Sequence, residues 1–260
     1  MTLLTVVLQI YYAREMQMKF NMSKELHWRF SENLWNLSNI DNYRSIISPK
    51  LIFPTKEADS NKISVQEAQI IYISLLNQTN YYYSLEAPTK HLYVRDGKIP
   101  RIGNIDLSLY TLMLEKDIKS GVEKGKFILE KNVEFKSGQP DYKKFMNDIE
   151  KLLVEGIDGA WIHLLNDANS GDINHLFRKF IASFTHLHQH KVIDLEDLNS
   201  NISIDFFVNI QDKKCALLKR FEVDKYKKNS QVYVNNFFDI SYEVINEKIN
   251  IKESNGWTVF

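Results

Sequence analysis

The sequence predicts a three-layer α/β protein in which helices flank a mixed central sheet. Apolar residues recur at helical spacing over residues 64–77 and 142–156. Shorter apolar runs between and after these segments have the length and composition of strands. The resulting order is helix, three strands, helix, strand, helix. Beyond residue 186 the apolar runs are all strand-like, which predicts a β-rich C-terminal region.

Residues 1–62 are expected to form an N-terminal helical extension. Apolar residues recur at helical spacing after Ser23, which is suited to an N-cap, and predict a helix over residues 23–36. Residues 49–62 contain two prolines among polar side chains and indicate a loop. The first twelve residues are mostly apolar, but too few to span a membrane and without the features of a signal peptide. They are expected to be a buried element or an over-extended gene start.

The predicted core occupies residues 63–185. Ser64 and Glu67 have the spacing of a capping box, which begins the first core helix. Asp96-Gly97 is typical of a tight hairpin turn between the first two strands. Gly121 and Gly125 indicate a connection or short helix before the third strand. The predicted strands are residues 91–95, 103–113 and 127–136.

A helix, a buried strand and another helix complete this core. The apolar run from Gly159 to Leu165 is suited to a buried strand, and Asp172 to the cap of the helix after it. Residues 186–260 are expected to extend the core as a β-rich region. Its strand candidates are residues 202–210, 215–223, 231–240 and 249–260.

The net charge and the cysteine content limit the classes of function that the protein can have. The chain has 33 basic and 33 acidic residues, and this zero net charge argues against a general nucleic-acid coat protein, which needs an excess of positive charge. An enzyme with a local basic groove is compatible with zero net charge. Cys215 is the one cysteine, so neither an intrachain disulfide nor a cysteine-rich zinc site can form. A single cysteine is typical of a reducing compartment and predicts a cytoplasmic protein, and no membrane association is expected.

Two carboxylates and a lysine are the best candidates for chemistry. Asp106 and Glu134 each lie within an apolar strand, and alternation places Glu134 and Lys136 on the same strand face. If the two strands are neighbours, the three groups form one cluster. Mg²⁺ prefers such oxygen ligands, so Asp106 and Glu134 are predicted to hold a metal. A bound metal activates water and polarises phosphate, while Lys136 can orient that water or stabilise developing charge.

This arrangement resembles the PD-(D/E)xK, or restriction-endonuclease-like, nuclease superfamily over about residues 64–184. That family has a helix-strand-strand-strand-helix-strand core, with an acid on the second strand and Glu/Asp-x-Lys on the third. Asp106 matches the first acid, and Glu134 with Lys136 matches the paired motif. Ile105 stands where the family often has proline. The resemblance implies a restriction-endonuclease-like core that uses Mg²⁺, or Mn²⁺, to hydrolyse phosphodiester bonds, above all in DNA, in restriction or defence against foreign DNA.

The resemblance also implies a further acidic residue, for which two candidates remain open. Glu67 lies on the first helix, where the family often supplies an acid, and Glu86 lies just before the first predicted strand. Gln139, Lys144 and Asp148 could approach the same site from the following helix.

Residues 212–228 form the most basic segment, with seven basic and three acidic side chains. Phe221 and Tyr226 interleave with them, so the segment could contact phosphates while an aromatic ring stacks on a base. The alternative is the solvated rim of a hairpin. The residues predicted to contact nucleic acid are Lys213, Lys214, Lys219 and Arg220, together with Lys144 of the core.

Two alternatives to a nuclease stay open. Charged residues on strands usually face solvent, so Glu134 and Lys136 could form a surface ion pair of little energetic value. The same fold could also be a catalytically inactive module that binds nucleic acid or a protein partner. Cleavage of both DNA strands would favour a homodimer.

Overall fold

The computed structural model describes ten segments of the chain. These are residues 23–37, 63–93, 99–116, 123–139, 141–166, 170–189, 202–223, 242–245, 248–251 and 258–260. The apolar first twelve residues, the loop at 49–62, the Asp96-Gly97 turn and the strand expected at 231–240 lie outside the described residues.

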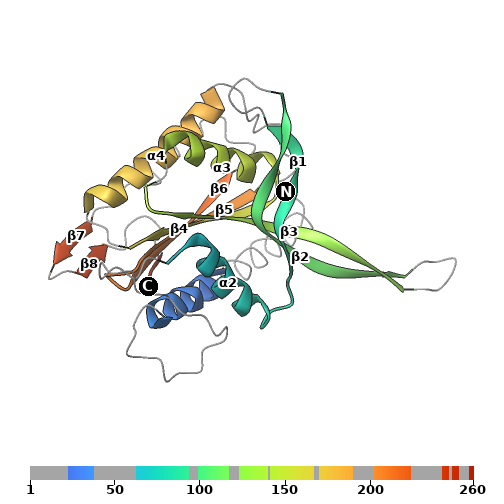
Figure 1. The fold of residues 1–260 in the computed structure, drawn as a ribbon, viewed down its shortest axis with the longest axis horizontal. Coiled ribbons are helices and arrows are strands. Elements are labelled where there is room, and N and C mark those ends of the chain that lie inside the picture. The colour runs from blue at the N-terminus through green and yellow to red at the C-terminus, as the bar shows by residue number, and fades with distance from the viewer. Residues whose placement is uncertain are drawn as a thin grey trace, which may run out of the picture.

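A seven-stranded mixed sheet forms the centre of the protein (Figure 1). Its strands, in spatial order, are β1 (Tyr82–Tyr93), β2 (Arg101–Lys116), β3 (Glu123–Ser137), β4 (Asp158–Leu165), β5 (Ile202–Ile210), β6 (Cys215–Val223) and β9 (Thr258–Val259). Strands β7 (Tyr242–Ile245) and β8 (Lys248–Ile251) form a separate hairpin. The described helices are residues 23–37, α2 (Val65–Leu76), α3 (Tyr142–Val154) and α4 (Ser170–Gln189).

The strand directions make the sheet mixed. Strands β1, β2 and β3 are antiparallel neighbours, whereas β3, β4 and β5 run parallel. Helices α3 and α4 make the two crossovers that parallel neighbours require. Strands β6 and β9 then add antiparallel to the same sheet. The mixed α/β class predicted from the sequence is therefore confirmed.

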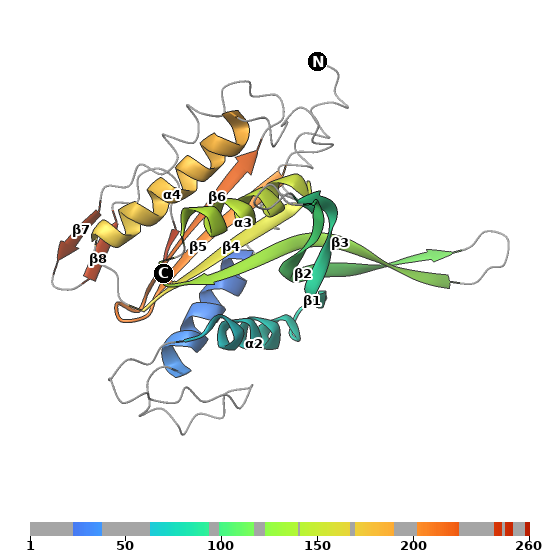
Figure 2. The ribbon, with the colours of Figure 1, turned by 45° about the horizontal axis from the view of Figure 1, so that its top comes forward.

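Helices cover both faces of this sheet (Figure 2). Helices α3 and α4 pack on one face, around the buried side chains of Trp161 and Phe206. The helix at 23–37 and α2 pack on the other face, around Phe135 and Phe207. Since side chains alternate along a strand, Glu134 lies on the α3 side of β3 while Phe135 lies on the opposite side. No helix in the described segments is both long enough and apolar enough to cross a membrane.

Helices α2 and α3, which pack on opposite faces of the sheet, each begin at an N-cap. Ser64 Oγ accepts the backbone N–H of Glu67, and the Glu67 carboxylate accepts the N–H of Ser64, so the predicted capping box is confirmed. Asp141 caps α3 by accepting the N–H of Lys144 at 2.8 Å. These caps satisfy backbone donors that a helix start leaves unpaired.

Several predicted boundaries are wrong for identifiable reasons. Strand β1 begins at Tyr82 rather than at residue 91. Pro88 looks like a break in the sequence, but β1 is an edge strand, where a missing N–H is tolerated. Gly125 lies inside β3 rather than in a connection, and α4 begins at Ser170, so Asp172 is within that helix and not its cap. Strand β7 was not anticipated. Helix α4 also continues through residue 189, past the boundary expected at 185.

A buried ion cluster joins the helix at 23–37 to the sheet. Asp205 of β5 is fully buried and accepts two hydrogen bonds from Arg220, at 2.8 and 3.2 Å, and one from the ammonium of Lys131. The Ser23 hydroxyl also donates to it. Burial alone would raise the pKa of Asp205, but Lys131, the His27 ring 3.8 Å away and Arg220 outweigh burial and hold that pKa well below its usual value.

We expect Asp205→Asn to destabilise the protein at pH 7 by about 3–5 kcal/mol, because Lys131 and Arg220 would lose their buried counter-charge. Since the folded pKa lies below the ordinary value of 3.8, this contribution is complete above that pH and is lost as the pH falls through the folded pKa. Urea unfolding of both proteins between pH 3 and pH 7 measures it. Asp141→Asn is the matched control, because Asp141 is 58% exposed and asparagine is an equally good N-cap. Equal losses in the two variants would contradict the account.

Candidate functional site

Three carboxylates from two strands and a helix meet around one lysine. Asp106 comes from β2, Glu134 and Lys136 from β3, and Asp148 from α3. The Lys136 ammonium lies 3.1 Å from Asp148 Oδ2, 3.7 Å from Glu134 Oε2 and 3.9 Å from Asp106 Oδ2. The predicted grouping of Asp106, Glu134 and Lys136 is thus present in the structure, with Asp148 as a fourth member.

The group forms where β2 and β3 separate. Their pairing ends at Leu107 opposite Val133, so the next backbone groups have no partner on the neighbouring strand. Asp106 Oδ2 accepts the N–H of Phe135 at 2.8 Å and thereby replaces the missing strand contact. This bond fixes the Asp106 carboxylate beside Glu134 on the rigid part of the sheet.

Lys151 is a fifth member that the sequence analysis missed. Its ammonium bonds the buried Glu134 carboxylate, donates to the Asn104 carbonyl at 2.8 Å and lies 3.3 Å from Asp148 Oδ1. Its side chain is 6% exposed. One signal was available: Lys144, Asp148 and Lys151 recur at i, i+4 and i+7, which places all three on one stripe of α3.

With all three carboxylates ionised, the site holds three negative and two positive charges, so one negative charge is uncompensated. Burial raises the pKa of Glu134 well above its usual value; Asp148 and Asp106 add to the effect, and Lys151 and Lys136 oppose it. Burial would lower the pKa of Lys136, but Asp148, Glu134 and Asp106 outweigh it and raise that pKa. Lys136 therefore stays protonated at neutral pH, and the group favours additional positive charge.

An open groove gives access to this group. It is lined by Glu86, Ile102, Gly103, Asn104, Lys136, Lys144, Asn147, Asp148 and Lys151. Glu86 lies between Leu85 and Ala87, which pair with Leu107 and Ile105, so it stands opposite Asp106 in the strand register. Its φ of 49° is unusual for a residue with a side chain, and such strain clusters at functional sites.

The structure separates the two candidates for an extra acid. Glu86 lines the groove, whereas Glu67 does not. The Glu67 carboxylate is engaged by the Ser64 backbone, on a helix that packs against the opposite face of the sheet. Glu67 therefore lies away from Asp106, Glu134 and Asp148.

The basic residues predicted to contact nucleic acid do not form one surface. Lys144 lines the groove and is 76% exposed. Lys213 and Lys214 lie in the turn between β5 and β6. Arg220 is engaged by Asp205, and the neighbouring Lys219 lies on the other sheet face, where burial lowers its pKa to about 8. Phe221 and Tyr226 have no described side-chain position.

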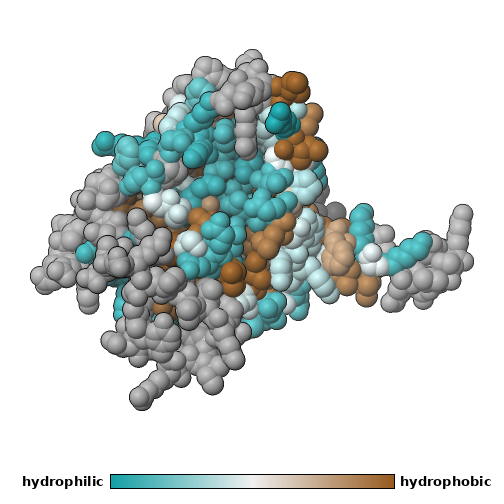
Figure 3. Space-filling view, viewed as in Figure 1, coloured by the Kyte–Doolittle hydropathy of each residue, from teal (hydrophilic) through white to brown (hydrophobic). Residues whose placement is uncertain are grey.

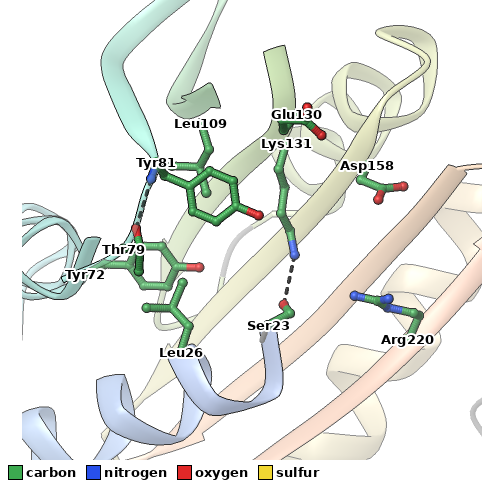
Figure 4. Close-up of a pocket in the computed structure, with 10 residues that line it drawn as sticks. All are labelled: Ser23, Leu26, Tyr72, Thr79, Tyr81, Leu109, Glu130, Lys131, Asp158 and Arg220. Atoms are coloured by element: carbon green, nitrogen blue, oxygen red, sulfur yellow. Dashed lines mark hydrogen bonds between the residues drawn. The ribbon is translucent and has the colours of Figure 1, made fainter. Parts of the chain in front are cut away.

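A second pocket lies on the opposite face of the sheet (Figure 4). Lys131 reaches across it to Ser23, and Arg220 lies on the same side, while Tyr72 and Tyr81 form the other wall. Its two cations bind the buried carboxylate of the ion cluster. Because these charges already have a partner within the protein, the groove is the stronger candidate site.

The oxygen atoms of Asp106, Glu134 and Asp148 are chemically suited to a divalent cation. Among the described residues, no three His, Cys, Asp or Glu side chains are spaced to share a metal ion. The Lys136 ammonium lies among the carboxylates. However, Glu134 Oε2 is buried and accepts no hydrogen bond. Hard oxygen donors with surplus negative charge are what Mg²⁺ or Mn²⁺ requires. Asp106, Glu134 and Asp148 could hold such an ion if Lys136 moved aside.

Comparison of the chain with protein-family models, with curated proteins and with solved structures gives no match. Function is therefore inferred from the chemistry of the groove.

We expect Lys151→Met to destabilise the protein by about 3–5 kcal/mol at pH 7, because the buried Glu134 carboxylate loses its nearest cation. The folded pKa of Glu134 is raised, so stability is greatest below its ordinary value of 4.5 and declines as the pH rises through the folded pKa. The loss in Lys151→Met should accordingly shrink as the pH falls toward 5. Urea unfolding from pH 5 to pH 8 tests this, with the exposed Lys144→Met as control. A loss independent of pH would refute the assigned pairing.

Proposed function

We propose that this protein is a metal-dependent nuclease that hydrolyses phosphodiester bonds in DNA. The observation that carries the proposal is the meeting of Asp106, Glu134 and Asp148 around Lys136 beside an open groove. Carboxylate oxygens suit Mg²⁺ or Mn²⁺, and a lysine beside them suits a phosphate substrate. The surplus negative charge of the group supports a role in binding a cation.

We further propose that the core is restriction-endonuclease-like. The order α2, β1, β2, β3, α3, β4 agrees with the element order of that superfamily. The first acid lies on the second strand and Glu-x-Lys on the third, as the family pattern requires. The mixed sheet with helices on both faces supports the proposal.

Each residue of the group has a distinct chemical role in this proposal. Asp106 and Glu134, with Asp148, would hold the metal ion, which lowers the pKa of an attacking water and polarises the phosphate. Lys136 has a raised pKa, so it would act as a cation that orients the water and stabilises charge on the phosphate, rather than as a base. Lys151 would hold the Glu134 carboxylate in place through the hydrogen bond from its ammonium group.

The groove also supplies groups for substrate contact. Lys144 is exposed at its edge, and Asn147 lies one turn further along α3. A lysine and an amide are both suited to phosphate oxygens. Since the whole chain has zero net charge, binding would depend on such local contacts and not on a general positive surface.

A second candidate is a catalytically inactive module with the same fold, which binds nucleic acid or a protein. One observation favours it: Lys136 and Lys151 together pair with all three carboxylates, so the group is nearly neutralised within the protein. This reading predicts that added metal changes neither binding nor cleavage.

Cleavage of supercoiled plasmid, linear duplex and single-stranded DNA, each with Mg²⁺, Mn²⁺ or EDTA, tests the two candidates. We expect metal-dependent cutting that falls by about 10²–10³-fold or more in Glu134→Gln and in Lys136→Ala. Glu25→Gln and Lys24→Ala are matched controls, because both residues are exposed on the helix at 23–37, which packs on the other sheet face.

Cutting that persists in both site variants would eliminate this centre. Wild-type protein that binds DNA without cutting it, with or without metal, would support the inactive module.

A further inference from the structure

The β2–β3 hairpin extends beyond the rest of the sheet (Figures 1 and 2). Strand β1 pairs with β2 only as far as Tyr110, and β4 pairs with β3 only from Lys131. Residues 111–116 and 123–130 thus form a two-stranded ribbon, called here the β-arm, whose strands pair only with each other in the described part of the chain. An isolated two-stranded ribbon is marginally stable in water.

One face of the β-arm is apolar. Leu112 pairs with Phe127 across the ribbon, and Leu114 pairs with Gly125. A Cβ at Gly125 would lie 3.0 Å from Leu112 and 4.0 Å from Leu114, which confirms that these side chains share one face. The Phe127 ring contacts Tyr82 at the base of the arm, with ring centroids 4.9 Å apart. Leu114 is 62% and Phe127 56% exposed.

The other face of the β-arm is largely polar. By strand alternation it carries Met113, Lys124, Lys126, Ile128 and Glu130. Thr111 Oγ1 donates to Glu130 Oε1 at 2.9 Å on this side. An apolar face backed by a polar one is the pattern of a ribbon that packs against a partner on one side. Figure 3 shows hydrophobic side chains on the arm where it leaves the body of the protein.

The distribution of charge on the arm indicates what packs against its apolar face. The leucines and aromatic residues of this face carry no charge, so that part of it offers nothing to the phosphates of a nucleic acid. At the outer end of the same face the strand register places Lys116 opposite Glu123, two residues of opposite charge. Two copies of this uncharged part of the face can meet without placing like charges together. The zero net charge of the chain also removes repulsion between whole molecules.

We propose that the apolar face of the β-arm is the contact through which two copies of this chain form a symmetric dimer. Each copy would present the same side chains about a two-fold axis, so the contact is self-complementary. The two ribbons would pack face to face about 10 Å apart, as layers of a small β-sandwich. This assembly does not depend on the proposed nuclease activity.

The area of the apolar face sets the expected strength of the dimer contact. Half-exposed leucine and aromatic side chains each offer roughly 100 Å², so four per copy would bury on the order of 800 Å² in total. That is below the roughly 1,200–2,000 Å² of stable specific interfaces, so a weak, concentration-dependent dimer is expected.

Sedimentation velocity of the full chain from about 1 to 100 µM, without nucleic acid, tests the proposal. We expect a monomer–dimer equilibrium that Leu114→Lys weakens at least about 100-fold, because each dimer would bury two unpaired ammonium groups. Met113→Lys is the matched control: Met113 adjoins Leu114 and is 42% exposed, but faces the other side of the arm. It should leave the dimer unchanged.

Phe127→Lys, from the facing strand, repeats the test should Leu114→Lys fail to fold. A wild-type chain that stays monomeric to 100 µM would overturn the proposal, and so would equal weakening by Leu114→Lys and Met113→Lys. Monomeric protein that binds a membrane vesicle or DNA through the arm would assign the face to a different partner.

Discussion

Burial of the Glu134 carboxylate is the constraint on which the candidate site depends. A charged group without contact with water costs several kcal/mol unless cations and hydrogen bonds compensate for it. Glu134 is fully buried, and Lys151 and Lys136 supply the compensation. Lys151 reaches it from α3, the crossover helix that immediately follows β3. The βαβ connection that builds the parallel part of the sheet thereby also assembles the acidic group.

The two faces of the sheet carry ionic clusters with opposite charge balance. Asp205 has an excess of cations around it, and its pKa is held down, so the cluster is complete without any ligand. Glu134 has two carboxylates and two ammonium groups around it, and burial pushes its pKa up. Lys131 and Lys136 of the same strand serve one cluster each, on different faces. The first cluster fastens the helix at 23–37 to the sheet, whereas the second is the one at which we propose that a metal ion binds.

Sequence reasoning predicted the order of the core elements because local signals define them, such as the capping box at Ser64 and the apolar run of β4. Alternation also placed Glu134 and Lys136 on one face. Lys151 was missed because a lysine on an amphipathic helix usually faces solvent, and only the tertiary structure shows that its ammonium is buried. For the same reason Arg220 was expected at a phosphate, although Asp205 engages it within the protein.

We propose that Asp106, Glu134 and Asp148 together form one cation site. Electron paramagnetic resonance of free Mn²⁺, titrated with the protein, measures this without any assumption about substrate. The account predicts that wild-type protein binds Mn²⁺, that Glu134→Gln abolishes the binding and that Glu25→Gln leaves it intact. Wild-type protein that leaves all Mn²⁺ free, or binding that survives in Glu134→Gln, would contradict the claim.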